Sequence, residues 1–230
     1  PIPIYITLNG TWIQGETITQ QLHSPEQLRL NGSNGFRQPP VQVVSGIDPT
    51  RQSLMQSDQP HSSLHDLDVV FPLLHGPNGE DGTVQGLLEL ADIPYVGSGV
   101  LASAVGMDKA MMKAVFASRG LPQVDYLVYT RNQWEKDPSG ISEEIIDRLG
   151  LPCFVKPANL GSSVGISKPK TKEELLTAMD TAARFDRKMM IEAFVDAREI
   201  EVAVLGNEEP IASIPGEIIP SKEFYDYEAK

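Results

Sequence analysis

The sequence predicts a mixed α/β protein with more than one lobe. In the first part of the chain, short apolar runs at residues 4–8, 41–44 and 69–71 alternate with turn-rich or helical segments, as in an open α/β sheet. Further along, residues 201–205 and 211–214 flank a Gly-Asn turn and predict an antiparallel hairpin. The 230 residues are enough for two smaller lobes or one large core.

Cap and turn residues divide the part of the chain between these two patterns into helices and strands. Helices are expected after Thr83, after the cap residues Asp108 and Ser142, and after a capping box of Thr171 with Glu174. Strands are expected at 94–96, 153–156 and 189–192. The polar stretches 31–40 and 52–63 are expected to be surface connections.

Composition excludes several classes of protein. The 31 acidic residues exceed the 19 basic ones, and the net charge of -12 disfavours nonspecific binding to nucleic acid or to anionic membranes. Cys153 is the only cysteine, so no intramolecular disulfide can form, and a buried strand residue in a reducing cytosol is expected. No apolar run approaches the roughly 20 residues of a spanning helix. We therefore expect a cytoplasmic protein that holds any anionic ligand by local positive charge.

A strand that ends in Lys156 runs into a loop of small residues, among them Gly161, Ser162 and Ser163. Glycines let a backbone approach a polyphosphate, hydroxyls donate hydrogen bonds and a lysine supplies charge. Taken alone, an ordinary Gly/Ser turn explains this loop better, and no Walker A motif is present. Lys109 supports the phosphate interpretation, because a cation in the first turn of a helix is disfavoured unless an anion compensates it. The alternative for Lys109 is a surface lysine paired with Asp108.

Three other segments have two interpretations each. Residues 192–195 leave a strand and Glu199 follows, so backbone groups could contact a purine and a carboxylate could accept ribose hydroxyls; otherwise these acids are solvated charges. Residues 75–83 follow a strand, where a substrate role for His75 has the same weight as a turn in which Asp81 or Thr83 caps the next helix. Gly97-Ser-Gly99-Val-Leu-Ala resembles a dinucleotide fingerprint, but no strand ending in an acid follows it, which favours a turn between lobes.

Four segments, in the same order along the chain, resemble the D-alanine:D-alanine ligase family of the ATP-grasp superfamily. They are residues 75–83, residues 97–100 with 107–109, residues 155–157 with 161–165, and residues 224–230. The resemblance implies an α+β ATP-grasp fold. An incomplete N-terminal substrate-side domain would cover residues 1–105, a central ATP-grasp domain residues 106–195, and the start of the C-terminal ATP-grasp domain residues 196–230.

The resemblance also implies a reaction and the residues that perform it. ATP and Mg²⁺ would drive ligation of two D-alanines through an acyl phosphate, for peptidoglycan precursors. ATP would be held by Lys109, Phe154, Lys156, Gly161, Ser162, Ser163, Glu192, Ala193, Phe194, Val195, Glu199 and Lys230. His75 and Ser162 would orient the first D-alanine, Lys156 would neutralise the transferred phosphoryl group, and Tyr225 would belong to a lid over residues 225–230. No metal ligand is expected within the chain, because those of the family would follow Lys230.

The family pattern further predicts that the chain is truncated at both ends and that these 230 residues alone do not ligate. The expected partners are D-alanine, ATP and a second copy of the protein, with no nucleic acid and no membrane. Three alternatives remain: a noncatalytic nucleotide-binding fragment, another ATP-grasp carboxylate-amine ligase, and, ranked last, a dinucleotide-binding dehydrogenase.

Overall fold

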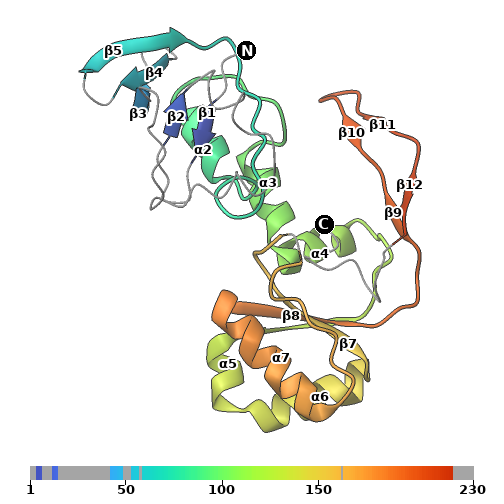
Figure 1. Cartoon of the computed structure of the whole chain (residues 1–230). Helices are drawn as coiled ribbons and strands as arrows, with labels where there is room; N and C mark the ends of the chain where they lie inside the picture. Colours follow the sequence, from blue (N-terminus) through green and yellow to red (C-terminus); the bar gives the residue numbers. More distant parts are fainter. Residues whose placement is uncertain are drawn as a thin grey trace. The chain divides into compact units, whose positions relative to one another are not determined.

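The computed structural model describes residues 4–6, 12–14, 42–48, 53–56, 59–161 and 163–219 (Figure 1). The chain divides into two compact units. Residues Pro1–Pro72 and Gln85–Gly97 form the first, and Leu73–Val84 and Ser98–Lys230 form the second. Of the expected site residues, Ser162, Tyr225 and Lys230 lie outside the described residues.

The described strands of the first unit form one antiparallel sheet in the order β1-β2-β3-β4-β5. Their bounds are Ile4–Ile6, Trp12–Gln14, Gln42–Asp48, Ser53–Gln56 and Gln59–Asp66. The expected strands at 4–8 and 41–44 are present as β1 and β3, but they belong to an antiparallel sheet and not to the open α/β sheet that was predicted. The interpretation of residues 52–63 as a connection was wrong, because backbone groups alone make an antiparallel ladder and a polar sequence can supply them.

The first unit keeps its α/β character at one place. Val70 and Tyr95 form a parallel bridge, in which the Val70 N–H donates to the Pro94 carbonyl at 2.8 Å and the Val96 N–H donates to the Val70 carbonyl at 2.9 Å. Helix α2 (Thr83–Leu90) lies between these two segments along the chain. The expected strands here are reduced to a single bridge, since Pro72 and Pro94 have no N–H to extend the ladder.

The second unit is built on a three-stranded antiparallel sheet in the order β6-β8-β7. The strands are β6 (Tyr126–Thr130), β7 (Cys153–Pro157) and β8 (Lys188–Ala193), and helices α5 (Arg131–Lys136), α6 (Pro138–Leu149) and α7 (Lys172–Phe185) pack against one face (Figure 1). Burial of apolar side chains between that face and the helices stabilises the unit. The residues of this core include Leu127, Trp134, Ile141, Ile145, Cys153, Val155, Leu175, Met179, Ala182, Met189 and Ile191.

Helix caps explain where the helices of the second unit begin. Asp108 caps α4 (Lys109–Ser118) as expected, and its carboxylate accepts the N–H groups of Ala110 and Met111. The Thr171 hydroxyl accepts the Glu174 N–H at 3.2 Å, but the Glu174 carboxylate accepts the Lys170 N–H, so only half of the expected capping box forms. Both helices start at the predicted residues.

The predicted start of α6 at Ser142 was wrong. The helix begins at Pro138 and Asp137 caps it, accepting the Gly140 N–H at 2.8 Å. Proline suits the first helical position because its fixed φ matches a helix and its missing N–H costs no bond there. Two helices were missed: α3 (Val100–Met107), where a turn was expected, and α5, which a Thr130–Gln133 capping box opens.

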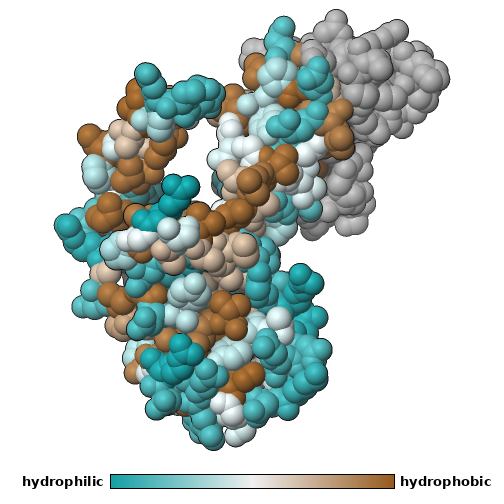
Figure 2. Space-filling model, turned by 180° about the vertical axis from the view of Figure 1, so that it is seen from behind, coloured by the Kyte–Doolittle hydropathy of each residue, from teal (hydrophilic) through white to brown (hydrophobic). Residues whose placement is uncertain are grey.

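After β8 the chain forms a two-stranded arm, defined here as residues 199–219. It comprises β9 (Glu199–Glu201), β10 (Val204–Leu205), β11 (Ile211–Ala212) and β12 (Gly216–Ile218), with β10 pairing to β11 and β9 to β12 in antiparallel register. This confirms the expected hairpin, with Gly206 at its turn in a positive-φ conformation (117°). Apolar side chains of the arm are exposed, namely Ile200, Val202, Val204, Leu205, Ile211 and Ile214. Brown, hydrophobic atoms are visible on the surface of the chain in Figure 2.

Candidate functional site

Side chains of strand β7 alternate between the two faces of the sheet. Cys153 and Val155 are fully buried against the helices, whereas Phe154 and Lys156 lie on the opposite face of the sheet. In the register of the sheet, Phe154 and Tyr126 are the two neighbours of Glu192 on β8. Since paired residues point to the same side, Glu192 lies on this second face, between two aromatic rings.

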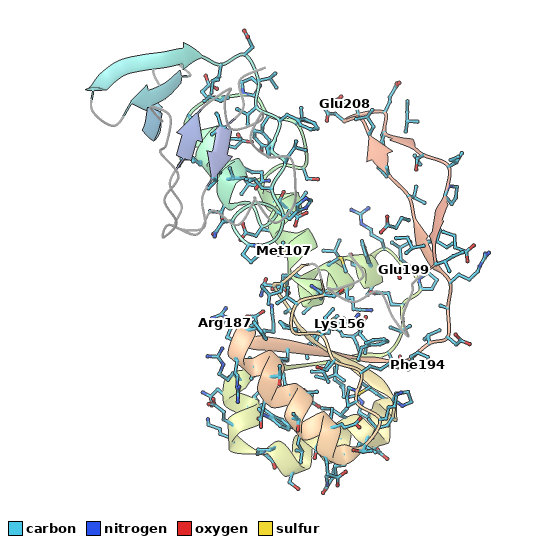
Figure 3. The ribbon with its side chains drawn as sticks, in the orientation of Figure 1. Met107, Lys156, Arg187, Phe194, Glu199 and Glu208 are labelled. Carbon is cyan, nitrogen blue, oxygen red and sulfur yellow. The ribbon has the colours of Figure 1, made fainter. Side chains whose placement is uncertain are left out.

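Two lysines converge on the Glu192 carboxylate. The Lys156 ammonium pairs with Oε2, and the Lys113 ammonium, from α4, lies 2.7 Å from Oε1. Lys113 also lies over the Tyr126 ring, 5.0 Å from its centroid. Burial raises the pKa of the Glu192 carboxyl, but the charges of Lys156 and Lys113 outweigh it and hold the pKa below its usual value. The side chain of Lys156 lies between the sheet and α4 (Figure 3).

Lys109 brings a third ammonium into the same region. Its backbone N–H donates to the Ala158 carbonyl at 3.0 Å, and its ammonium donates to the Leu160 carbonyl, just before Gly161. Burial, and then the positive charge of Lys156, lower the pKa of Lys109. The predicted alternative, a surface pair of Lys109 with Asp108, is wrong, because Asp108 pairs with Lys188. Lys109, Lys113 and Lys156 thus bring three ammonium groups to the region of Glu192, and Asp186 and Asp108 also lie near enough to Lys109 to act on its charge.

The glycine-rich loop of residues 158–165 is fixed at its start and folds into a turn. The backbone and side-chain N–H groups of Asn159 donate to the Asp186 carboxylate at 2.8 and 2.9 Å. The Val164 N–H donates to the Gly161 carbonyl at 3.2 Å, and Gly165 has φ of 71°. A Cβ at Gly161 would lie in ordinary van der Waals contact, with its nearest neighbour at 3.8 Å.

The loop that contains His75 lies beside the glycine-rich loop. A Cβ at Gly161 would be 3.8 Å from Glu80 Oε2 and 3.9 Å from the Gly76 Cα. The His75 side chain is 86% exposed, and its Nδ1 is 4.0 Å from Glu80. The Asp81 carboxylate accepts the N–H groups of Asn78 and Thr83, at 2.8 and 3.0 Å, and so shapes the turn. Both expectations for this segment are therefore compatible: Asp81 organises the loop, and His75 projects from it.

The segment that follows β8 carries the aromatic part of the site. The rings of Phe154 and Phe194 have centroids 6.2 Å apart at an angle of 42°, and Lys168 lies 4.0 Å from the Phe194 centroid. The backbone N–H of Ala193 donates to the Asp125 carbonyl at 2.9 Å. Phe194, Val195 and Glu199 are exposed. Glu192, Phe154 and Phe194 thus come together, and Glu199 follows at the start of the arm.

The sequence models that match the chain identify its family. One, described as D-ala D-ala ligase N-terminus, matches residues 1–98, and another, described as D-ala D-ala ligase C-terminus, matches residues 115–230. The chain belongs to the D-alanine–D-alanine ligase family.

Curated relatives and solved structures agree with this membership. The chain is 52% identical to the D-alanine–D-alanine ligases of Geobacillus thermodenitrificans and Heliobacterium modesticaldum; each alignment covers 100% of this chain, and 61% and 60% of those relatives. The ligase structure from Coxiella burnetii matches with a TM-score of 0.75 at 37% identity, over 94% of this chain and 60% of that one. VanG D-Ala:D-Ser ligase from Enterococcus faecalis matches with a TM-score of 0.79 at 33% identity, over 98% and 62%. The chain spans about three fifths of the length of these relatives.

Lys113 and Lys168 are the side chains at this candidate site that sequence reasoning missed. Lys113 follows Lys109 by four residues on one helix, and this spacing places both on the same helix face. The spacing was therefore a usable signal for Lys113. No local pattern points to Lys168, which reaches the two phenylalanine rings from a segment beyond the glycine-rich loop.

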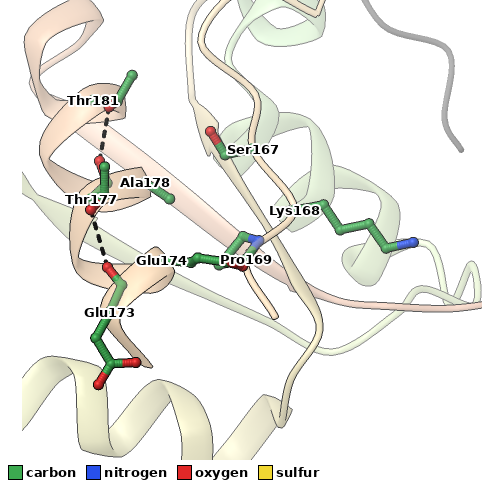
Figure 4. Close-up of a pocket in the computed structure, with 8 residues that line it drawn as sticks. All are labelled: Ser167, Lys168, Pro169, Glu173, Glu174, Thr177, Ala178 and Thr181. Carbon is green, nitrogen blue, oxygen red and sulfur yellow. Dashed lines mark hydrogen bonds between the residues drawn. The ribbon is translucent and has the colours of Figure 1, made fainter. Parts of the chain in front are cut away.

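A separate groove of about 400 Å³ lies on the helical side of the ligase-family fold, between α7 and residues 167–169 (Figure 4). Glu173 and Glu174 line it, and the hydroxyls of Thr177 and Thr181 donate to the carbonyls one turn earlier. Lys168 also lines the groove, and its side chain extends away from α7 in Figure 4. The acidic lining does not suit an anionic ligand.

Two features are absent from the described residues of this family member. No group of three His, Cys, Asp or Glu side chains in that part of the chain is arranged to hold a metal ion. Within the same residues, no helix is both long and apolar enough to cross a bilayer.

Proposed function

We propose that this protein performs the reaction of its family: ATP-dependent joining of two D-alanines to D-alanyl-D-alanine for peptidoglycan precursors. The observation that carries the proposal is the convergence of Lys109, Lys113 and Lys156 on one face of the β6-β8-β7 sheet, where Lys109 also contacts the glycine-rich loop. The sequence relationship to D-alanine–D-alanine ligases supports the same conclusion.

The charges of the cluster fit a polyphosphate. Lys109 and Lys156 disfavour each other's charge, which is one cause of the lowered pKa of Lys109. A bound triphosphate would remove this repulsion and accept hydrogen bonds from both ammonium groups. Backbone N–H groups of the glycine-rich loop, together with Ser162 and Ser163, would supply further donors. ATP therefore matches the donor set of this chain.

The aromatic part of the site fits the nucleoside. We expect a purine to lie against Phe154 and Phe194, with Glu192 and the backbone of Ala193 to Val195 at its polar edge. Glu199 would accept hydrogen bonds from the ribose hydroxyls. Lys230 would be a further contact to ATP.

ATP would transfer its γ-phosphoryl group to the carboxylate of the first D-alanine, which forms an acyl phosphate and releases ADP. The amine of the second D-alanine would then attack the acyl carbon, lose a proton and displace inorganic phosphate. Lys109 and Lys156 would neutralise charge on the transferred group, so that catalysis rests mainly on positioning and electrostatics. His75 and Ser162 would orient the first D-alanine, and a lid containing Tyr225 would exclude water. The described residues do not form a site that fits Mg²⁺.

The remaining parts of the proposal concern organisation. The substrate-side domain would cover residues 1–105, the central ATP-grasp domain residues 106–195 and the start of the C-terminal ATP-grasp domain residues 196–230. A cytoplasmic homodimer would follow the pattern of the family.

Titration of the 230-residue chain with ATP, with and without D-alanine, tests the nucleotide site, and mass spectrometry of D-alanyl-D-alanine formed by the whole protein tests the reaction. Lys156→Met is expected to weaken ATP binding about tenfold or more, the loss of one charge-assisted hydrogen bond. Lys172→Met is a matched control, because Lys172 pairs with Glu143 on the helical side of the sheet. Absence of saturable ATP binding to the unsubstituted chain would contradict the proposal. Saturable binding that D-alanine does not alter would favour a noncatalytic nucleotide-binding protein.

A further inference from the structure

Lys113 is a buried cation to which the proposed reaction assigns no contact. Its side chain is 9% exposed, and its ammonium lies 2.7 Å from Glu192 Oε1. The Tyr126 ring covers another side of the ammonium, at 5.0 Å. Lysine is rarely buried to this extent without a specific partner. The partner here is a carboxylate that a second lysine also uses.

The two lysines occupy different oxygens of that carboxylate. Lys156 pairs with Oε2 and Lys113 with Oε1, so either lysine can leave without displacing the other. The Lys156 side chain is 23% exposed, whereas that of Lys113 is enclosed by α4 and the sheet. Lys156 is therefore the lysine that can turn toward a ligand.

A change of partner by Lys156 has an electrostatic consequence. Glu192 is 8% exposed, and a buried carboxylate that loses its only cation is strongly destabilised. With Lys113 on the other oxygen, Glu192 keeps a neutralising partner after Lys156 has moved. Without Lys113, Glu192 would hold Lys156 and compete with any phosphate for it.

We propose that Lys113 is a positioning residue: it keeps Glu192 neutralised while Lys156 exchanges the Glu192 carboxylate for the phosphates of ATP. The proposal rests on the proposed nucleotide site. It assigns to Lys113 an effect on polyphosphate affinity, exerted through Glu192 and Lys156, without contact between Lys113 and the nucleotide.

The test compares ATP with adenosine, which has no phosphate, in titrations of the full chain. Lys113→Met is expected to weaken ATP binding about tenfold, a usual size for coupling between two sites. Adenosine binding should stay within about twofold, because Lys156 still holds Glu192 in place. Lys113→Arg keeps the charge and should restore ATP binding. Lys172→Met serves as the control lysine on the helical side.

The same substitution in the E192Q variant separates the positioning role of Lys113 from simple damage to the fold. In E192Q no buried carboxylate competes for Lys156, so adding K113M should change ATP affinity by less than about twofold. An equal loss in both backgrounds, or equal losses for ATP and adenosine, would overturn the positioning role. Unchanged ATP affinity in K113M would overturn it as well.

The proposed function and this inference fail differently. If the unsubstituted chain does not bind ATP, the nucleotide site itself is wrong. If K113M does not fold, a crystal structure of the unsubstituted chain with ATP decides. We expect the Lys113–Glu192 pair to persist and the Lys156–Glu192 pair to be lost; retention of Lys156 on Glu192 would refute the inference.

Discussion

Lys109→Met should separate stability from nucleotide binding. The substitution removes the ammonium that donates to the Leu160 carbonyl and leaves an apolar side chain of similar length. In the folded chain, burial and the charge of Lys156 lower the pKa of Lys109. A lysine with a lowered pKa is disfavoured in its charged form by the fold, so its charge opposes folding near neutral pH.

The expected magnitudes follow from this balance. Loss of the hydrogen bond to Leu160 destabilises the fold, whereas removal of a buried charge that Lys156 repels stabilises it. The two effects act in opposite directions, so the free energy of unfolding should change by less than about 1 kcal/mol. ATP binding should lose one charge-assisted hydrogen bond, about 1.5–3 kcal/mol, or about tenfold to a hundredfold in Kd. Lys109 would thus contribute to binding at little benefit to stability.

Urea unfolding followed by circular dichroism measures the first quantity, and ATP titration measures the second. Lys136→Met is the matched control, because Lys136 is an exposed lysine at the end of α5. A loss of stability above about 2 kcal/mol, more than a usual net hydrogen bond, together with unchanged ATP affinity would refute the reasoning.

Three further predictions concern stability. Gly165→Ala should lower the free energy of unfolding in urea by about 1–3 kcal/mol more than Gly150→Ala, which is the usual cost of overpacking. Both glycines have φ of 71°, but only the new Cβ at Gly165 would meet Phe185, at 2.8 Å. Equal losses of stability in the two variants would contradict this. Ile145→Ala removes a fully buried side chain and should cost about 2–5 kcal/mol in the same assay, and a cost below about 1 kcal/mol would be inconsistent with its burial. Because the fold lowers the pKa of Glu192, its charge stabilises the fold above the reference value of 4.5, and this stabilisation is lost as pH falls through the lowered pKa. The urea midpoint of E192Q should therefore fall less with decreasing pH than that of the unsubstituted chain. An equal fall in both would contradict this.

The sequence predicted best those elements whose signals are local. Asp108 and Thr171 are cap residues that act within one turn, and both helices begin where these caps placed them. The hairpin of the arm follows from its Gly206 turn in the same way. Ser142 misled the prediction because it is also a cap type, and the Asp137-Pro138 pair upstream is the stronger start signal.

Features that depend on pairing between distant segments could not be predicted from the sequence. Phe154, Lys156 and Glu192 were chosen as site residues, but their meeting depends on the register of β7 and β8, across 36 residues of sequence. Lys113 was missed although it follows Lys109 by four residues on one helix, because its burial depends on how α4 packs against the sheet. The antiparallel order of the first sheet is likewise set by which strands pair, which a run of apolar residues does not encode.

The alternation along β7 has a consequence for how this strand can vary. Cys153 and Val155 pack against helices, while Phe154 and Lys156 face the charged side. Deletion of one residue within the strand would turn Lys156 toward the apolar core and place Val155 among the lysines, since side chains alternate strictly. We therefore expect β7 to accept conservative exchanges at single positions but no change in length, and insertions in homologous sequences to fall in the segments on either side of it.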